Sequence, residues 1–198
     1  MSNSARVGPN AAIQVFAALQ RRDESAAKSV ARRAGLSPWL DAPPQEMIAE
    51  TDAARLHAAV RATLAPDAAD AVLAEAGRTT ADYLLSHRIP KLAQWALRAA
   101  PARLAAKGLA RAISANAWTF AGSGRFSAAV DEAAIFEIYD NPFCAGQPGG
   151  RRICVWHAGV FERLFQTLVS PHAQVRETAC CAANSPCCRF LLSWRRPA

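Results

Sequence analysis

The spacing of apolar residues predicts helices at the start of the chain. Apolar positions over residues 7–22 recur at helical intervals, and Asn10 stands where a side-chain cap of the first turn is expected. A second helical stretch, residues 23–34, consists largely of small side chains and ends at Gly35, which suits a left-handed C-terminal cap. Prolines interrupt the pattern over residues 37–44, where we expect a loop or linker.

Helical spacing continues as far as residue 115. Residues 45–64 and 66–87 are predicted as two helices, and Pro90 closes the second, because the residue before a proline avoids helical dihedral angles. Residues 92–115 are again helical, with Pro101 in the first turn of a second segment within them. The first 115 residues are therefore predicted to be mainly helical.

The pattern changes after residue 115. Aromatic residues alternate over residues 116–127, and residues 135–139 form a second extended run, which together predict antiparallel strands with a glycine bend. Residues 155–169 return to helical spacing. Two further strands are predicted at residues 175–182 and 187–194. A mainly helical part is thus followed by a strand-rich part with one helix.

The composition suits one well-packed domain. Of the 198 residues, 52% are hydrophobic and 20% charged, which is enough for one core and short for two. The formal charge of +7 comes mainly from arginine and suits a nucleic acid, an anionic membrane surface or a carboxylate ligand. No nucleic-acid partner is expected, since the sequence lacks helix-turn-helix, zinc-finger and single-strand-binding patterns.

The chain carries no signal for export or for spanning a membrane. It begins with polar residues rather than with an apolar leader, which favours a cytoplasmic, reduced protein. Because no run of 18 apolar residues occurs, no transmembrane helix is expected.

Residues 92–115 combine basic and apolar positions. Cations recur every four residues and form one helical face, consisting of Arg103, Lys107 and Arg111. The opposite face is predicted to carry Leu104, Leu109 and Ile113. Two interpretations stay open, a solvated basic face or an amphipathic helix in peripheral contact with a membrane surface.

Four residues in the last quarter of the chain form a candidate metal site, namely Cys154, Glu177, Cys180 and Cys188. Three thiolates and one carboxylate can hold Zn²⁺ tetrahedrally, and a site with four protein ligands is structural because no position stays open for water. The spacing is not that of common zinc fingers, so the thiols suit small buried hydrophobes equally well. Disulfides are disfavoured in a reduced compartment, and near a zinc Cys181 and Cys187 are bystanders or alternative ligands.

Motifs for catalysis and for redox cofactors are missing. Gly122 and Gly124 lack the third glycine of the dinucleotide fingerprint, and neither a P-loop nor an iron–sulfur run occurs. His87 and His157 suit ordinary core or surface histidines with backbone partners; the alternative is axial ligation of the central metal of a tetrapyrrole.

Three segments carry a family likeness. Residues 116–124 read Asn-Ala-Trp-Thr-Phe-Ala-Gly-Ser-Gly, residues 140–144 read Asp-Asn-Pro-Phe-Cys, and residues 161–180 run from Phe-Glu-Arg-Leu-Phe to Glu-Thr-Ala-Cys. In these segments the chain resembles the bacteriochlorophyll 4-vinyl reductase family of photosynthetic bacteria, and the likeness covers nearly the whole chain. The C-terminal half is similar to the wider 4-vinyl-reductase domain, a small-ligand-binding module related in fold to haem-based nitric-oxide sensors.

The resemblance implies an α+β fold, in which N-terminal helices are followed by a small antiparallel sheet covered by helices. It also implies a division into a helical N-terminal extension, residues 1–44, and a ligand-binding domain with a C-terminal zinc site, residues 45–198. In the sensor branch of the superfamily, three cysteines and one glutamate hold zinc. The same spacing falls on Cys154, Glu177, Cys180 and Cys188, so the resemblance favours structural Zn²⁺ over no metal.

The resemblance further implies a role in bacteriochlorophyll biosynthesis, acting on a magnesium tetrapyrrole such as divinyl protochlorophyllide or chlorophyllide. Because no cofactor motif for a reduction is found, we favour a tetrapyrrole-binding accessory or carrier protein over the 8-vinyl reductase itself. A ligand-sensing scaffold is a third alternative. Expected partners are the Mg-porphyrin intermediate and other pathway enzymes; peripheral contact with the photosynthetic membrane and a homodimer stay open.

A flat macrocycle with carboxylates needs an apolar slot with a cationic rim. Arg125 and Arg88 are candidates for the rim. The candidates for the slot are aromatic, and would equally suit a plain core: Trp118, Phe120, Phe126, His157, Phe161 and Phe165.

Overall fold

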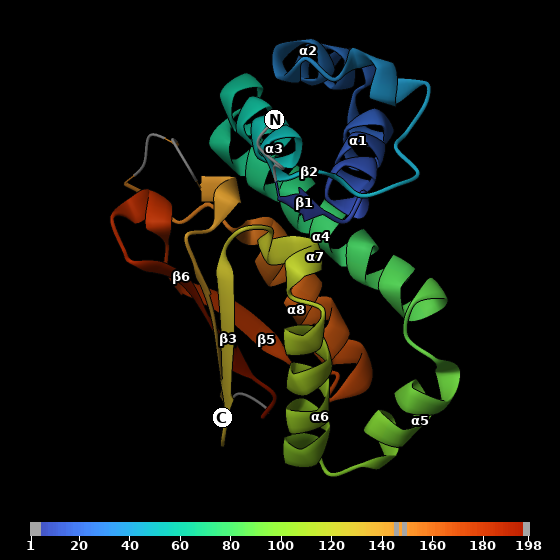
Figure 1. Ribbon diagram of the computed structural model, residues 1–198, viewed down its shortest axis with the longest axis vertical. Helices are drawn as coiled ribbons and strands as arrows, with labels where there is room; N and C mark the ends of the chain where they lie inside the picture. Colours follow the sequence, from blue (N-terminus) through green and yellow to red (C-terminus); the bar gives the residue numbers. More distant parts are fainter. Residues whose placement is uncertain (1–4, 145–146, 148–149, 196–198) are drawn as a thin grey trace.

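The structure is a computed structural model that describes residues 5–144, 147 and 150–195 (Figure 1). Helices fill the first part of the described chain and a four-stranded antiparallel sheet the last part, which confirms the α+β class. The helices are α1 (Asn10–Arg22), α2 (Glu24–Ala34), α3 (Glu50–Thr63), α4 (Pro66–His87), α5 (Lys91–Ala99), α6 (Ala102–Ala115), α7 (Trp118–Ala121) and α8 (Val155–Leu168). The strands are β1 (Arg6–Val7), β2 (Ile48–Ala49), β3 (Arg125–Val130), β4 (Ala134–Tyr139), β5 (Gln174–Ala179) and β6 (Cys187–Ser193). Short 3₁₀ helices are η1 (Ser37–Leu40), η2 (Pro142–Cys144) and η3 (Cys181–Ala183).

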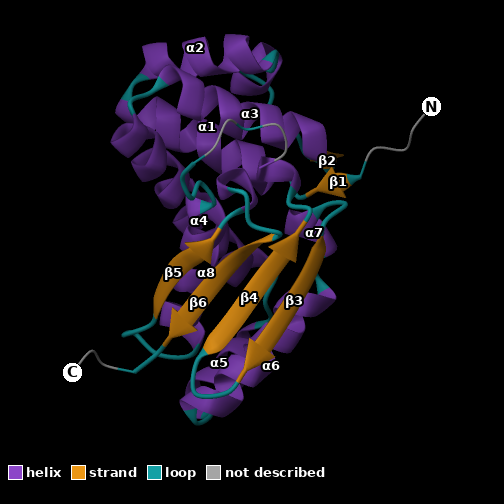
Figure 2. Cartoon of the chain, turned by 90° about the vertical axis from the view of Figure 1, so that its left-hand side faces the viewer, coloured by secondary structure: helices purple, strands orange, loops and turns teal. Residues whose placement is uncertain are grey.

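The sheet has the strand order β3-β4-β6-β5, and every neighbouring pair is antiparallel. Alternate residues of a strand point to opposite faces, so Phe136 of β4 and Phe190 of β6, which pair directly, share the buried face. Figure 2 shows the opposite face toward the viewer, with the helices behind the sheet. That outer face carries exposed residues such as Ile135 and Arg189. The core is therefore built against one face of the sheet.

Helix α8 lies between the sheet and helix α4 and packs closely on both. Phe161 of α8 is buried against the aromatic residues of the sheet. On the α4 side the backbones nearly touch: a Cβ atom at Gly77 would lie 2.2 Å from the carbonyl oxygen of Trp156. A Cβ atom at Gly159 would lie 2.7 Å from the carbonyl oxygen of Ala74. Glycine at these two positions therefore sets the distance between α4 and α8.

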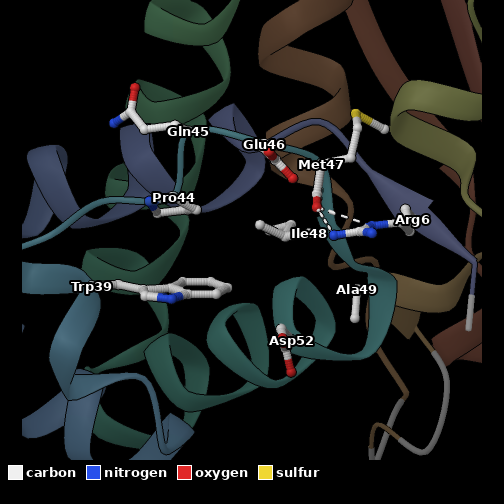
Figure 3. A pocket seen from close by; sticks show the side chains of 9 residues that line it. All are labelled: Arg6, Trp39, Pro44, Gln45, Glu46, Met47, Ile48, Ala49 and Asp52. Atoms are coloured by element: carbon white, nitrogen blue, oxygen red, sulfur yellow. Dashed lines mark hydrogen bonds between the residues drawn. The ribbon is translucent and has the colours of Figure 1, made fainter.

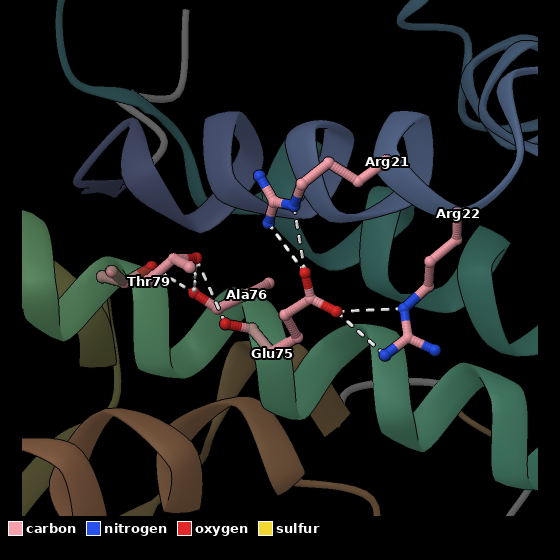
Figure 4. A network of polar contacts seen from close by, with 6 residues as sticks. Arg21, Arg22, Glu75, Ala76 and Thr79 are labelled. Carbon is pink, nitrogen blue, oxygen red and sulfur yellow. Dashed lines mark hydrogen bonds and ion pairs between the residues drawn. The ribbon is translucent and has the colours of Figure 1, made fainter.

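The N-terminal helices pack on the same core. Arg21 and Arg22 at the end of α1 both pair with Glu75 of α4, each at 2.9 Å (Figure 4). Since both arginines are half exposed, such pairs contribute at most about 1 kcal/mol each. Burial of Val15 and Leu19, which join the continuous core, contributes more. The boundary at residue 44 stays a prediction.

The strand expected over residues 116–127 is only half present. Residues 118–121 form the helical turn α7, and β3 begins at Arg125. Gly122 follows the turn with a φ of 57°, a conformation that glycine adopts without strain. The prediction was wrong here because the alternation of Trp118 and Phe120 reflects one turn of helix, in which one aromatic ring faces solvent and the other the core.

Two helix starts also differ from their predictions. Asn10 does not cap α1; it is the first helical residue, and its Oδ1 accepts a hydrogen bond from Gln14 Nε2 at 3.1 Å. The helix predicted from residue 45 begins at Glu50, because Ile48 pairs with β1 in a short antiparallel ladder.

The faces predicted for residues 92–115 are partly wrong. Helix α6 buries Leu109 and Ile113, as expected, but leaves Leu104 60% exposed. The reason is helical geometry: Leu104 lies three residues before Lys107 and seven before Arg111, so it belongs to the basic face.

Several other predictions are confirmed. Gly35 adopts the left-handed conformation, with a φ of 69°, at the end of α2, and α6 follows Pro101 directly. Helix α8 and strands β5 and β6 lie close to their predicted positions. Within the described ranges, no helix combines the length and the hydrophobicity that crossing a bilayer requires.

A buried histidine gives the fold a predicted pH dependence. The Nε2 of His57 donates to the carbonyl oxygen of Ala11 at 3.0 Å, and burial, reinforced by the nearby Arg61 cation, lowers the pKa of His57 to about 3. The unfolded chain binds this proton near pH 6.5, so stability is complete above that pH and is lost as the pH falls toward 3. We expect urea unfolding to show that the free energy gap between the wild type and His57→Gln narrows by about 1 kcal/mol from pH 7.0 to pH 5.5.

In His57→Gln the amide can still donate to Ala11, but the side chain does not titrate. All other titrating groups are common to both proteins and cancel in the difference. Parallel stability curves for the two proteins would contradict the assignment of this pH dependence to His57.

Candidate metal centre

Four cysteine thiols meet in the interior at the junction of η2, α8, β5 and β6. Cys144 ends η2, Cys154 immediately precedes α8, Cys180 follows β5, and Cys188 lies in β6. All four are buried, and each sulfur lies close to the other three. The Sγ–Sγ distances are 3.2 Å for Cys144–Cys154, 3.8 Å for Cys144–Cys180, 3.5 Å for Cys144–Cys188, 3.9 Å for Cys154–Cys180, 3.3 Å for Cys154–Cys188 and 3.8 Å for Cys180–Cys188.

These six distances fit a tetrahedral metal ion. A disulfide needs about 2.0 Å between sulfurs, and all six cysteines are free. Sulfurs bound to Zn²⁺ at about 2.3 Å stand roughly 3.8 Å apart at the corners of a tetrahedron. Three of the observed distances match that value within about 0.1 Å, and the others need only a small expansion. The donor set is therefore four thiolates in a closed site.

Hydrogen-bond donors surround the sulfurs. The Nδ2 of Asn141 lies 3.4 Å from Cys154 Sγ and 3.5 Å from Cys188 Sγ, and the backbone N–H of Cys181 lies 3.4 Å from Cys188 Sγ. Such donors stabilise thiolates rather than thiols. Because four thiolates around Zn²⁺ carry a net charge of −2, donors of this kind are required around the closed site.

A cation also lies beside the cluster. Arg61 donates to the carbonyl oxygen of Phe143 at 3.2 Å, and its buried Nε has no hydrogen-bond partner among the described residues. Burial lowers the pKa of Arg61, while the thiols of Cys144 and Cys154 raise it. A partly buried guanidinium facing sulfur rather than a carboxylate suits an anionic metal–thiolate cluster.

Glu177 lies next to the cluster but outside it. Its Oε2 accepts a hydrogen bond from the backbone N–H of Cys154 at 2.9 Å, where the positive end of the α8 dipole lies. Its Oε1 is buried without a partner among the described residues, and burial raises the pKa of Glu177 to about 8. The structure thus unites Cys154, Cys180 and Cys188 as predicted, with Cys144 in the fourth position.

The remaining two cysteines lie apart from the four. Cys181 is half buried in η3, and Cys187 faces the outer side of the sheet, with its sulfur 3.8 Å from Glu137 Oε1. They stand as bystanders in this arrangement.

The aromatic residues predicted to form a ligand slot fill the space between α8 and the sheet. Phe161 packs edge to face on Phe120, Phe136 and Phe190, with ring centroids 5.2 to 5.7 Å apart. Phe165 is fully buried in the same layer, whereas Phe120 and Phe126 are half buried at its edge. The rings are thus in mutual contact, with their accessible edge under α7 and β3.

Two residues predicted to bind the ligand lie elsewhere. Trp118 is 58% exposed on the outer side of α7. Arg125 lies on the outer face of the sheet, where its guanidinium stacks on the Tyr139 ring at 4.0 Å, whereas Phe126 occupies the inner face. The structure therefore does not bring Arg125 together with the aromatic layer. Arg88, the other rim candidate, caps the end of α4.

His157 is the polar member of the aromatic layer. It is 2% exposed, touches Phe120, Phe143 and Phe161 through ring contacts, and its Nε2 lies 3.4 Å from the carbonyl oxygen of Phe120. Burial lowers the pKa of His157 to about 4, so the imidazole is neutral at pH 7. In contrast, His87 is exposed and bonds through Nδ1 to the Tyr83 carbonyl at 3.1 Å.

A cavity of about 510 Å³ lies away from both groups, beside the β1–β2 ladder (Figure 3). The Trp39 ring lies on one side of it, and Arg6, which donates to the carbonyl oxygen of Met47, on the other. The described residues that line this cavity include none of those predicted to bind a ligand.

Comparison with known proteins gives two kinds of relative. The 4-vinyl-reductase domain family matches residues 134–193. Over 187 residues the sequence is 46% identical to the "Bacteriochlorophyll synthase 23 kDa chain" of Cereibacter sphaeroides, which covers 94% of this chain and 90% of that one. The protein of the same name from Rhodobacter capsulatus is 40% identical over 188 residues, covering 94% and 86%. An H-NOX protein from S. oneidensis, solved in its Fe(II)NO state, shares the fold with a TM-score of 0.54 at 11% identity, covering 92% of this chain and 98% of that one.

Proposed function

This chain belongs to the family of the bacteriochlorophyll synthase 23 kDa chains, with a 4-vinyl-reductase domain, and we propose that it serves that pathway as an accessory protein that binds a magnesium tetrapyrrole. The names of the relatives support the pathway and the association with a pathway enzyme. The tetrapyrrole, such as divinyl protochlorophyllide or chlorophyllide, is the finer part of the proposal.

One observation carries the tetrapyrrole proposal: a neutral, buried imidazole lies at the inner side of an aromatic layer whose outer rings are accessible. His157 makes only one long polar contact, to the backbone of Phe120. A neutral imidazole nitrogen is a suitable axial ligand for magnesium in a macrocycle, and Phe120, Phe126 and Phe161 offer faces for its rings.

The segment α7 is the natural cover of this site. It spans a single helical turn, and the Phe120 carbonyl that faces His157 belongs to it. Polar contacts to other elements hold the segment: Gly8 N–H donates to the Thr119 carbonyl at 2.7 Å, and Glu50 accepts from Ser123. Displacing one turn of helix would expose the Nε2 of His157 and the Phe126 ring together.

We further propose that the four-cysteine cluster holds Zn²⁺ as a structural clamp, through Cys144, Cys154, Cys180 and Cys188. Bound there, the ion would cross-link η2, the start of α8, and the two terminal strands. The clamp would hold one end of α8, three residues before His157, against the sheet. The metal would therefore support the ligand site without taking part in ligand chemistry.

His157→Leu tests the tetrapyrrole site. This variant keeps an apolar side chain in the layer but removes the nitrogen ligand. We expect titration with divinyl protochlorophyllide, followed by absorption of the pigment, to give binding about tenfold weaker than in the wild type and a different spectrum of the bound pigment.

The matched control is His87→Leu, which removes an exposed histidine outside the layer and should leave affinity and spectrum unchanged. Wild-type spectra for the His157→Leu complex would refute axial ligation, and no spectral change with the wild type would refute pigment binding. Oxidation of a nicotinamide together with an ethyl product would instead identify a reductase.

A further inference from the structure

A long segment of the chain carries cations and no acidic residue. Between Asp82 and Asp131 the sequence contains no aspartate or glutamate but seven arginines and lysines. Among the described residues, only Arg103 of this set forms an ion pair, with Asp131 and Glu132. The segment therefore presents unneutralised positive charge, although the chain as a whole contains 16 acidic residues.

Large apolar side chains are exposed on the same segment. Leu92 and Trp95 of α5 are 77% and 67% exposed, and Leu104 in the first turn of α6 is 60% exposed. Leu92 and Trp95 lie three residues apart and so share one face of α5, with Lys91 and Arg98 flanking Trp95. Three exposed side chains of this size on one helical hairpin are a patch that a protein surface rarely shows without a partner.

The hairpin of α5 and α6 is held in place through its opposite side. Gln94 is the buried residue of α5, and its amide donates to the carbonyl oxygens of Leu85 and Ile89. Arg98 Nε donates to the Thr167 carbonyl at 3.1 Å, and Leu97 packs on Gly108 of α6. Fixed contacts therefore orient Leu92 and Trp95 outward, and Figure 1 shows α5 at a corner of the molecule, away from the sheet.

We propose that the α5–α6 hairpin binds the surface of an anionic lipid bilayer. Leu92, Trp95 and Leu104 would enter the boundary between headgroups and acyl chains, where tryptophan is favoured. Arg88, Lys91 and Lys107, at the border of this patch, would meet the lipid phosphates. A lipid surface fits better than a nucleic acid, because phosphate contacts alone give no reason to expose leucine beside the cations.

Vesicle sedimentation tests the proposal directly. The wild-type protein is expected to bind vesicles of phosphatidylglycerol and phosphatidylcholine at low salt, with a blue shift of tryptophan emission, and to bind pure phosphatidylcholine at least tenfold more weakly. The double variant Leu92→Ser/Trp95→Ser should lose at least tenfold in binding, and the charge variant Arg88→Glu/Lys91→Glu likewise.

The matched control is Arg32→Glu/Arg33→Glu, which changes the net charge equally on α2, at the other end of the molecule (Figure 1), and should stay within twofold of the wild type. Equal binding by Leu92→Ser/Trp95→Ser overturns the proposal, as does equal binding to both lipids. A dimer in the wild type that dissociates in that variant would also overturn it, because a second copy would then cover the patch. No pigment is present in these assays, so their failure leaves the proposed tetrapyrrole function untouched.

Discussion

Replacing Cys144 with serine is expected to abolish stoichiometric zinc binding. The purified wild-type chain should contain about one zinc, and Cys144→Ser about a tenth of that or less after dialysis against a chelator. The physical reason is that each of the four sulfurs is one corner of the same tetrahedron, so losing one opens a closed site. A thousandfold loss of affinity would remove about 4 kcal/mol of stability, measurable as a lower unfolding midpoint.

Two further variants keep this prediction falsifiable if Cys144→Ser does not fold. Glu177→Gln removes the carboxylate that the sequence places in the ligand set, and should retain the zinc because the structure places Glu177 on the Cys154 backbone N–H. Cys187→Ser removes a thiol outside the cluster and should also retain it. If Cys144→Ser keeps its zinc while Glu177→Gln loses it, the ligand set predicted from sequence is right and the four-cysteine set is wrong.

The sequence identifies three members of the cluster because they lie on regular elements. Cys154 begins a helix with clear helical spacing, and Cys180 and Cys188 flank or belong to strands with clear alternation. Cys144 ends a short 3₁₀ turn, and its position depends on the path of the chain after β4 rather than on any local period. Its one usable signal is strand pairing, since Ile138 opposite Cys188 brings the end of β4 to the cluster.

The aromatic pattern predicts the core better than it predicts a ligand site. Phe161 and Phe165 are buried where helical spacing puts them, but a spacing rule does not distinguish a filled interior from a slot. Arg125 could have been separated from Phe126 by sequence alone, because adjacent residues of a strand face opposite sides. The exposure of Trp118 could not, because it follows from a single helical turn set by the tertiary contacts of Gly8 and Glu50.

Close packing between α4 and α8 is the feature of the fold that the sequence pattern indicates least. Gly77 lies inside a predicted helix, although glycine there normally destabilises a helix by about 1 kcal/mol relative to alanine. The structure supplies the compensating reason, since the Trp156 backbone occupies the place of a side chain. A glycine that opposes helix propensity thus indicates contact with another backbone, but does not say which one.

Gly77→Ala is accordingly expected to destabilise the protein strongly. The new Cβ would lie 2.2 Å from the Trp156 carbonyl oxygen and 3.1 Å from the Val160 nitrogen, both backbone atoms that cannot rotate away. Separating α4 from α8 would loosen the core around Phe161, at a cost of about 3 kcal/mol or more, which outweighs the gain in helix propensity. Urea unfolding of the purified variant measures this loss.

The matched control is Gly108→Ala, the same substitution in the interior of α6. There the added Cβ would lie 3.1 Å from Leu97 Cδ2, the end of a flexible side chain that can move. Helix propensity should then decide the sign, so we expect Gly108→Ala to be neutral or to stabilise by up to about 1 kcal/mol. If both variants changed stability by the same amount, propensity alone would account for them, and the α4–α8 distance would not depend on Gly77. Opposite signs would show that contact between the two backbones, rather than the local preference of either helix, sets the position of α8 and of the histidine it carries.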